Sequence, residues 1–272
     1  MLKLAIGLPL LLLAACGVNV GNDKVQLSGN RVSRSFEAAG FDKVSLEGPD
    51  NVIVRVGPAV SVTAQGDSAL VDRLKIEVEK GQLKIGRRGK HDWGLFSNSS
   101  NGTGQAVTIT VTLPALAVAA VAGSGDMSVD RVTGGKFAAV VAGSGDLKVA
   151  SVTTREAEAV VAGSGDLSLD GVETGPFEMA VAGSGNLTAR GRAQSASLSI
   201  AGSGDIKAAE LSTGTAKVAV AGSGSVAVGA QNSADISILG SGDVDIHGPA
   251  ACKTSKMGSG EVRCHSAGQA GG

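Results

Sequence analysis

Aromatic residues are scarce in this chain, and their scarcity excludes several functions. The 272 residues include one tryptophan, five phenylalanines and no tyrosine. Proteins that bind single-stranded nucleic acid stack bases on aromatic side chains along a basic groove. This chain has no such platform, and its net charge is −1. We therefore expect no nucleic-acid partner, and a sugar site built on tryptophan or tyrosine is disfavoured as well.

The chain also lacks the signatures of disordered, collagen-like and cofactor-binding proteins. Hydrophobic residues make up 43% of it, whereas disordered chains are poor in such residues. Its 41 glycines do not recur at every third position, as collagen requires. Phosphate-binding loops lead from glycine into a helix, whereas the glycine-rich segments here lead into strand-like sequence. We expect a folded body without a cofactor.

The first 15 residues read MLKLAIGLPLLLLAA, with one basic residue and an apolar run as long as a signal-peptide core. They end in Leu-Ala-Ala before Cys16, which resembles the bacterial lipobox, where the cysteine is lipidated after cleavage. Gly17 stands where an inner-membrane retention signal would need aspartate. The sequence therefore predicts a signal peptide over residues 1–15 and an extracytoplasmic protein anchored by lipid on Cys16, with the outer membrane favoured. The alternative is ordinary signal cleavage with an incidental cysteine.

A tripeptide repeat dominates the second half of the chain. Steps of 20, 20, 20, 19, 20, 18 and 18 residues separate eight copies of Gly-Ser-Gly. The copies begin at Gly123, Gly143, Gly163, Gly183, Gly202, Gly222, Gly240 and Gly258.

The flanks of each copy alternate between apolar and polar residues, which indicates strands. Counting from the first glycine as zero, position −2 is apolar in seven copies, position +4 is apolar in all eight, and position +5 is largely polar. At −2 stand Val121, Val141, Val161, Val181, Ile200, Val220, Ile238 and, as the exception, Lys256; at +4 stand Met127, Leu147, Leu167, Leu187, Ile206, Val226, Val244 and Val262.

A unit of two short strands cannot bury its apolar side alone, but stacked units share one continuous interior. We therefore expect an all-β fold in which residues 115–265 form a right-handed parallel β-helix, or solenoid, of about eight rungs of 18–20 residues with Gly-Ser-Gly-Asp corners. A two-sheet sandwich of antiparallel hairpins is the alternative, although it would not need near-identical corners every 20 residues.

The segment before the repeats is β-rich but irregular. Residues 16–33 are polar and predict a tether, and residues 34–114 contain several alternating runs. Val44 and Leu46 precede Gly48-Pro49-Asp50-Asn51 at the offsets of a degenerate rung, and Ser68 to Arg73 predicts a helical turn. Residues 87–105 predict a long loop, either a binding loop or a mobile insertion. The loop carries His91, Trp93 and Phe96, and residues 266–272 predict a flexible tail.

The chain resembles a bacterial secreted family, the putative auto-transporter adhesin head GIN domain. The resemblance rests on the order of these segments, on the segment Val107 to Pro114 and on the series of Gly-Ser-Gly-Asp corners. The resemblance runs from about Phe36 to His265. It implies a β-rich extracytoplasmic domain and suggests adhesion, and it carries no functional residues with it.

The residue after each corner is usually acidic, so stacking should align carboxylates in a row. Such a row either holds cations, calcium being the expected ion for oxygen ligands, or accepts hydrogen bonds from corner amides. We favour hydrogen bonding because Asn186 and Ser225 interrupt the row. The acids of this acidic row are Asp126, Asp146, Asp166, Asp205, Asp243 and Glu261.

Two cysteines flank the last corner at positions −6 and +6. Outside the cytoplasm, Cys252 and Cys264 could form a disulfide that fixes the exposed end of the solenoid. Alternatively they are two small buried residues too far apart to bond, since a disulfide needs Cα atoms within about 7 Å.

Catalysis finds little support in the sequence. His91, His247 and His265 lie far apart, and their spacing predicts no zinc site. We expect a non-catalytic envelope lipoprotein that presents its surface for adhesion or scaffolding to an unidentified envelope ligand. Small outward residues such as Ala142, Ala162 and Ala182 also permit self-association. A polysaccharide-binding or polysaccharide-processing β-helix enzyme is the alternative.

Overall fold

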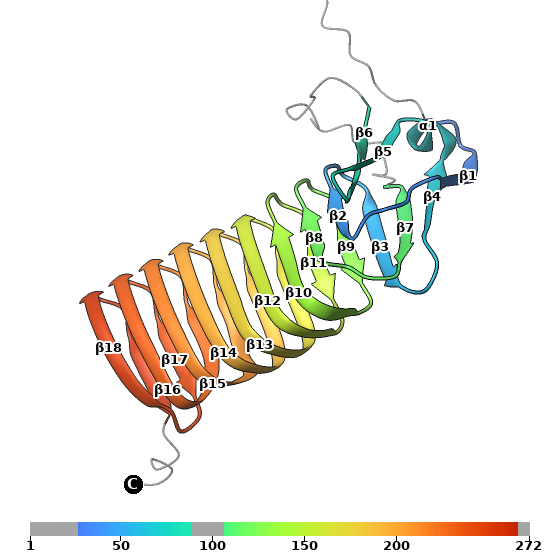
Figure 1. The fold of residues 1–272 in the computed structure, drawn as a ribbon. Coiled ribbons are helices and arrows are strands. Elements are labelled where there is room, and N and C mark those ends of the chain that lie inside the picture. The colour runs from blue at the N-terminus through green and yellow to red at the C-terminus, as the bar shows by residue number, and fades with distance from the viewer. Residues whose placement is uncertain (1–26, 89–105, 266–272) are drawn as a thin grey trace, which may run out of the picture.

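The computed structural model describes residues 27–88 and 106–265. The signal peptide, Cys16, His91, Trp93, Phe96 and the tail 266–272 lie outside the described residues. Figure 1 shows a long column of stacked strands with a broader, irregular assembly at its N-terminal end. The expectation of an all-β solenoid is confirmed, with about seven turns and parallel bridges about 20 residues apart.

Each strand of the repeat pairs in parallel with its own copy one rung away. Leu147 lies opposite Leu167, and Val161 lies opposite Val181. The alternative of unstacked antiparallel hairpins is therefore wrong for the repeat. The strands are β8 (Val118–Val121), β9 (Met127–Val129), β10 (Val132–Val141), β11 (Leu147–Val149), β12 (Val152–Gly163), β13 (Leu167–Gly183), β14 (Leu187–Gly202), β15 (Ile206–Gly222), β16 (Val226–Gly240), β17 (Val244–His247), β18 (Ala251–Gly258) and β19 (Val262–His265).

The alternating residues line one continuous aliphatic core. Val141, Val161 and Val181 are at most 2% exposed, and the larger Phe137 and Phe177 fill the same interior. Full burial of one such side chain stabilises a fold by about 1.5–3 kcal/mol. Because a shift of one residue would turn every apolar side chain outward, this pattern fixes the register of each rung.

Both glycines of each corner are needed, for partly different reasons. A Cβ on Gly204 would lie 2.1 Å from the carbonyl oxygen of Gly185 in the rung before, so the backbones leave no room for a side chain. Gly202 has the same constraint, with a Cβ 2.4 Å from the oxygen of Gly183, and its φ of +139° also disfavours other residues. The corners therefore stack by direct backbone contact.

The degenerate rung predicted around Gly48 is confirmed. Strand β2 pairs in parallel with β8, and β3 pairs with β9, so they form a rung directly before the first regular repeat. A further rung, made by β6 and β7, lies on the other side of β2 and β3. The order of rungs in space therefore differs from their order in the sequence. The strands are β2 (Lys43–Leu46), β3 (Asn51–Val56), β6 (Gln82–Arg87) and β7 (Thr108–Leu113).

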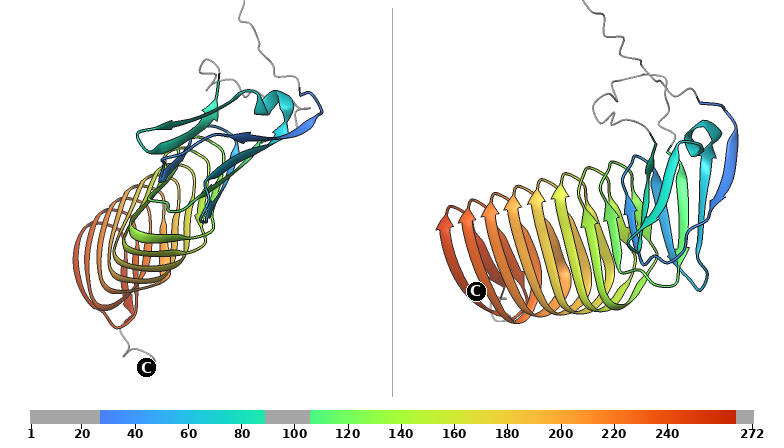
Figure 2. Two further views of the ribbon diagram at one scale, coloured as in Figure 1. Left: turned by 45° about the vertical axis from the view of Figure 1, so that its right-hand side comes forward. Right: turned by 45° about the horizontal axis from the view of Figure 1, so that its top comes forward.

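Antiparallel strands and a short helix cover this end of the column, as both views in Figure 2 show. Strand β4 pairs antiparallel with β1 and β7, and β5 pairs antiparallel with β6. The predicted helical turn is confirmed as a short helix whose Ala69 amide donates a hydrogen bond to the capping Asp67 carboxylate. We call these elements the N-terminal cap: β1 (Arg31–Phe36), β4 (Ser61–Asp67), α1 (Ser68–Val71) and β5 (Leu74–Glu79).

A buried ion pair lies beneath the cap. Asp50 is fully buried and accepts hydrogen bonds from the Arg87 guanidinium and from the Val107 amide, the latter at 3.0 Å. Asp50 takes the place of a corner glycine, because its backbone stacks directly on Gly125. The Asp50 carboxylate thus links the degenerate rung to Arg87 and Val107, the residues on either side of the segment 88–106.

The opposite end of the column has no further layer of described residues. In the last rung, Thr254 and Lys256 stand opposite Ile236 and Ile238, so polar residues replace the inward aliphatic ones. The Lys256 ammonium donates a hydrogen bond of 2.8 Å to the Gly260 carbonyl. Polar side chains therefore separate the aliphatic core from water at this end.

Candidate functional site

The acidic row is held by backbone hydrogen bonds. In each case the Oδ1 atom of one aspartate accepts a hydrogen bond from the amide of the following residue in the row, one rung further along. The donor to Asp126 is the Asp146 amide at 3.1 Å, and the donor to Asp205 is the Ser225 amide at 3.0 Å. The same contact links Asp146 to Asp166, Asp166 to Asn186, and Asp243 to Glu261.

These contacts match the hydrogen-bond interpretation of the row. Calcium needs six to eight oxygen ligands converging on one point. Among the described residues, none of the row's acids belongs to a group of three ligand atoms within 4.8 Å of one another. The carboxylates of the row therefore form no converging group of three among the described residues, and the cation interpretation stays the less favoured prediction.

The N-terminal half of the row borders a shallow groove. Asp126, Asp146 and Asp166 line it together with Lys148, so the groove carries charges of both signs. The other lining residues are Asn51, Val52, Ile53, Thr108, Met127, Ser128, Leu147 and Ser168.

The outer surface of the strands before each corner is built mainly from small residues. Ala162, Ala182, Ala201 and Ala221 pair in register on successive rungs, and all four are exposed. The row continues with Leu239, which is 58% exposed, and ends at Met257, which is 72% exposed. We call this surface the alanine face, and it comprises Val140, Ala142, Val160, Ala162, Ala180, Ala182, Ser199, Ala201, Ala219, Ala221, Leu239 and Met257.

Charged side chains elsewhere on the surface pair between rungs. The Lys136 ammonium donates a hydrogen bond of 2.9 Å to the Glu156 carboxylate, and this bond, followed by the charge of the carboxylate, raises the pKa of Lys136. Arg190 bridges Asp170 and Glu210 at 2.9 and 3.4 Å. These pairs are exposed to solvent, where ion pairs contribute little to stability. They align rungs and do not form a converging site.

The two cysteines of the last rung are joined. Cys252 on β18 and Cys264 on β19 form a disulfide with a Cα–Cα distance of 6.6 Å. The bond crosses the interior between the two strands of the last rung, next to the polar residues that close the column.

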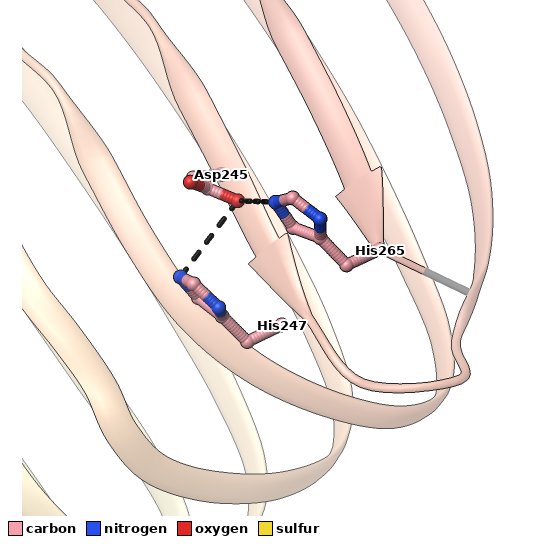
Figure 3. Close-up of side chains that lie close together, drawn as sticks. All are labelled: Asp245, His247 and His265. Carbon is pink, nitrogen blue, oxygen red and sulfur yellow. Dashed lines mark ion pairs between the residues drawn. The ribbon is translucent and has the colours of Figure 1, made fainter. Parts of the chain in front are cut away.

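One cluster of potential ligands went unrecognised in the sequence. His247 and His265 are neighbours in register on β17 and β19, and Asp245 lies two residues before His247 on the same face. Figure 3 shows both imidazole rings turned toward the same carboxylate. The sequence spacing predicted no zinc site, and the structure brings His247 and His265 together, whereas His91 lies outside the described residues. The signal was present, because both histidines occupy position +7 of their repeats, 18 residues apart.

The described residues contain no helix of the length and apolar character needed to cross a membrane.

The loop predicted over residues 87–105 starts and ends beside the Gly48 corner of the degenerate rung. The Glu47 amide donates a hydrogen bond to the Ile85 carbonyl before the loop, and the Asn51 amide donates one to the Val107 carbonyl after it.

Solved structures of similar fold include proteins from Parabacteroides and Bacteroides species. A crystal structure of a "putative lipid binding protein" from Parabacteroides distasonis is 26% identical, with a TM-score of 0.77 and coverage of 88% of this chain and 98% of the other. A "putative adhesin" from the same species is 23% identical, with a TM-score of 0.79 and the same coverage. Another from Bacteroides fragilis is 20% identical, with a TM-score of 0.67, covering 89% of this chain and all of the other.

No curated protein is significantly similar to the chain. A family model matches it over residues 40–174 and 149–250, which is most of its length and includes both the degenerate rung and the repeats. The chain therefore belongs to the family described as "Putative auto-transporter adhesin, head GIN domain".

Proposed function

We propose that this protein is a lipid-anchored component of the bacterial cell envelope that presents its solenoid as a surface for adhesion or scaffolding and catalyses no reaction. The alanine face carries this proposal. It repeats one exposed arrangement of small residues over successive rungs, which suits contact with an extended partner better than capture of a small molecule.

The groove beside the acidic row supports a non-catalytic role. General acid–base catalysis needs a carboxyl group free to exchange protons with a substrate. The Oδ1 atoms of Asp126, Asp146 and Asp166 instead accept backbone hydrogen bonds from the next rung. The uniformity of these contacts supports a structural role for each acid.

The sequence at Cys16 supports attachment through lipid, and Gly17 favours the outer membrane. Metabolic labelling with an alkyne fatty acid tests the anchor. The wild-type protein should acquire label and sediment with membranes, whereas Cys16→Ser should lose both. Unlabelled wild-type protein would contradict the anchor without bearing on the solenoid's binding surface.

Retention of cells on mucin-coated surfaces and cell-to-cell clumping test adhesion. In at least one of these assays, cells that display the protein should be retained in larger numbers, or clump more, than cells lacking the gene. Ala182→Lys with Ala201→Lys should abolish the difference, because two ammonium groups would stand on the alanine face. Ser168→Lys with Thr188→Lys is the matched control, since Lys148 and Lys207 already occupy that outward row.

Equal behaviour of cells with and without the protein, or full activity of the alanine-face variant, would contradict the proposal. Light scattering on purified protein tests self-association through the same face, and a monomer at high concentration would argue against it. Turnover of an acidic polysaccharide that is lost in Asp166→Asn would instead support the enzymatic alternative.

A further inference from the structure

We propose that Asp245, His247 and His265 bind a divalent transition-metal ion of the zinc type on the outer surface of the last two rungs. Asp245 and His247 come from β17, and His265 comes from β19 (Figure 3). One atom from each of the three side chains lies within 4.8 Å of the other two. This site is separate from the alanine face and does not depend on the adhesive role.

The distances within the cluster fit a single ion. The Oδ1 atom of Asp245 lies 2.9 Å from Nε2 of His265 and 3.7 Å from Nε2 of His247. Zinc binds imidazole nitrogen and carboxylate oxygen at about 2.0–2.2 Å. Two such ligands at angles of about 90–125° around one ion lie about 2.9–3.7 Å apart. Both measured separations fall within that interval.

The carboxylate oxygen at the centre of the cluster has no hydrogen-bond partner. Oδ1 of Asp245 is buried, and among the described residues no donor satisfies it. Nε2 of His265, 2.9 Å away, forms an ion pair with this oxygen only when the imidazole is protonated. Buried polar atoms are normally paired, so an orphaned carboxylate oxygen needs an explanation. An ion held between this oxygen and the two ring nitrogens would supply the missing partner.

The strands fix the three side chains before any ion arrives. Residues two apart on a strand share a face, which places Asp245 beside His247. The parallel register places His265 next to His247, with ring centroids 5.4 Å apart and ring planes within 19° of parallel. The disulfide at Cys264 holds the strand that carries His265. The site therefore requires small side-chain rotations and no change of fold.

The donor atoms and neighbouring charges select the kind of ion. Two imidazoles with one carboxylate suit zinc, copper or nickel, whereas calcium and magnesium prefer oxygen donors alone. Arg263 lies opposite Asp245, but its guanidinium binds both carboxylate oxygens of Glu261, at 3.1 and 2.7 Å. With Glu261 offsetting Arg263, Asp245 leaves a net negative charge that favours a cation. Three protein ligands also leave room for water on the ion.

Calorimetry and equilibrium dialysis with Zn²⁺ test the site. The protein should be residues 16–272 carrying Cys16→Ser, without a histidine tag, at a pH where imidazole is neutral. We expect one Zn²⁺ per chain. His247→Ala and His265→Ala should each weaken binding by more than about tenfold, because even outer partners of metal ligands contribute about 10–100-fold. Asp245→Asn should weaken it too, while His91→Ala and substitution of Ca²⁺ for Zn²⁺ serve as controls.

Cobalt gives an independent readout. Co²⁺ bound by nitrogen and oxygen ligands should produce visible absorption that His265→Ala abolishes, and circular dichroism should show that the variant keeps its strands. No binding at millimolar Zn²⁺ would overturn the proposal. So would binding that persists in the double variant His247→Ala with His265→Ala, because the ion would then lie elsewhere on the chain.

Discussion

The two ends of the solenoid cover the aliphatic core in different ways. At the N-terminal end, antiparallel strands and α1 form an extra layer over the stacked rungs. At the C-terminal end, the last rung exposes Thr254 and Lys256 in place of aliphatic residues, and a disulfide ties its strands together. One end is closed by additional structure and the other by substitution within the repeat, so the two should respond differently to mutation.

The largest effect is expected from Asp50→Ala at the N-terminal end. The change leaves the Arg87 guanidinium and the Val107 amide without their partner. Removing one member of a fully buried ion pair typically costs about 3–5 kcal/mol, and because the Arg87 side chain is 26% exposed we expect the lower end of that range. Urea unfolding should show a loss of that size. The double variant Asp50→Ala with Arg87→Ala should recover part of it, because no unpaired charge remains. A loss below about 1 kcal/mol would show that the cap does not depend on this pair.

Removal of the disulfide should be the next largest effect, and it should be local. The bond closes a loop with a sequence separation of 12, for which the chain-entropy model gives about 3 kcal/mol. Because end rungs of a solenoid can open separately, Cys252→Ala with Cys264→Ala should accelerate amide exchange in β18 and β19 and leave the inner rungs protected. Two free thiols in the denatured wild-type protein would show that the bond does not form. Faster exchange in every rung would contradict the local character of this end.

Acid should loosen the N-terminal end before the repeats. Desolvation is the largest influence on the buried Asp67 carboxyl and raises its pKa, but hydrogen bonds from Ser28, Ala69 and Gly29 together outweigh it and leave the pKa lowered. A lowered pKa in the folded state gives stability that is present above the unfolded value of about 3.9 and is lost as pH falls through the folded value.

Amide exchange across β1 and α1 should therefore rise as pH falls below about 3.9, after correction for intrinsic rates. Asp67→Asn should flatten this dependence, because the amide side chain does not titrate in this range. An unchanged profile in that variant would assign the acid response to other carboxylates.

The smallest effect on stability, but a clear effect on association, is expected from Lys256→Val. Valine would extend the apolar column of position −2 to the open end, where Ile238 is the last aliphatic member. The free energy of unfolding should change by less than about 1 kcal/mol. The chain should associate end to end, as light scattering would detect. Lys253→Val on the same strand adds equal apolar area on the outward side, and equal association of both variants would refute an end-specific effect.

The regular rungs were predictable because one physical rule acts on every copy. Alternation at positions −2 and +4 fixed which side chains face inward, and the corner glycines marked where the backbone turns. The same offsets identified the degenerate rung at Gly48. Each of these inferences needed only spacing within a single repeat unit, and the structure confirms them.

The features that were not predicted depend on contacts between segments that lie outside the repeat or far apart in the sequence. The antiparallel pairing of β1 with β4 leaves no periodic trace, because neither strand belongs to the repeat. Strands β2 and β3 lie between β6–β7 and β8–β9, so the order of rungs in space differs from their order in the sequence, and alternation cannot reveal such an order. The cluster at His247 could have been predicted, because His247 and His265 both occupy repeat position +7. Their separation in the sequence was considered instead of their position in the repeat.

Corner stacking has a consequence for length. Each corner touches only the corner before and the corner after it, through backbone atoms that are the same in every copy. Deleting one unit, such as Gly163 to Ala182, would bring Gly183 against Gly143, which is the neighbour that Gly163 now has. Recombination can therefore add or remove whole units without changing either end. The length of the solenoid can then vary among related proteins while the repeated pattern of its outer surface stays the same.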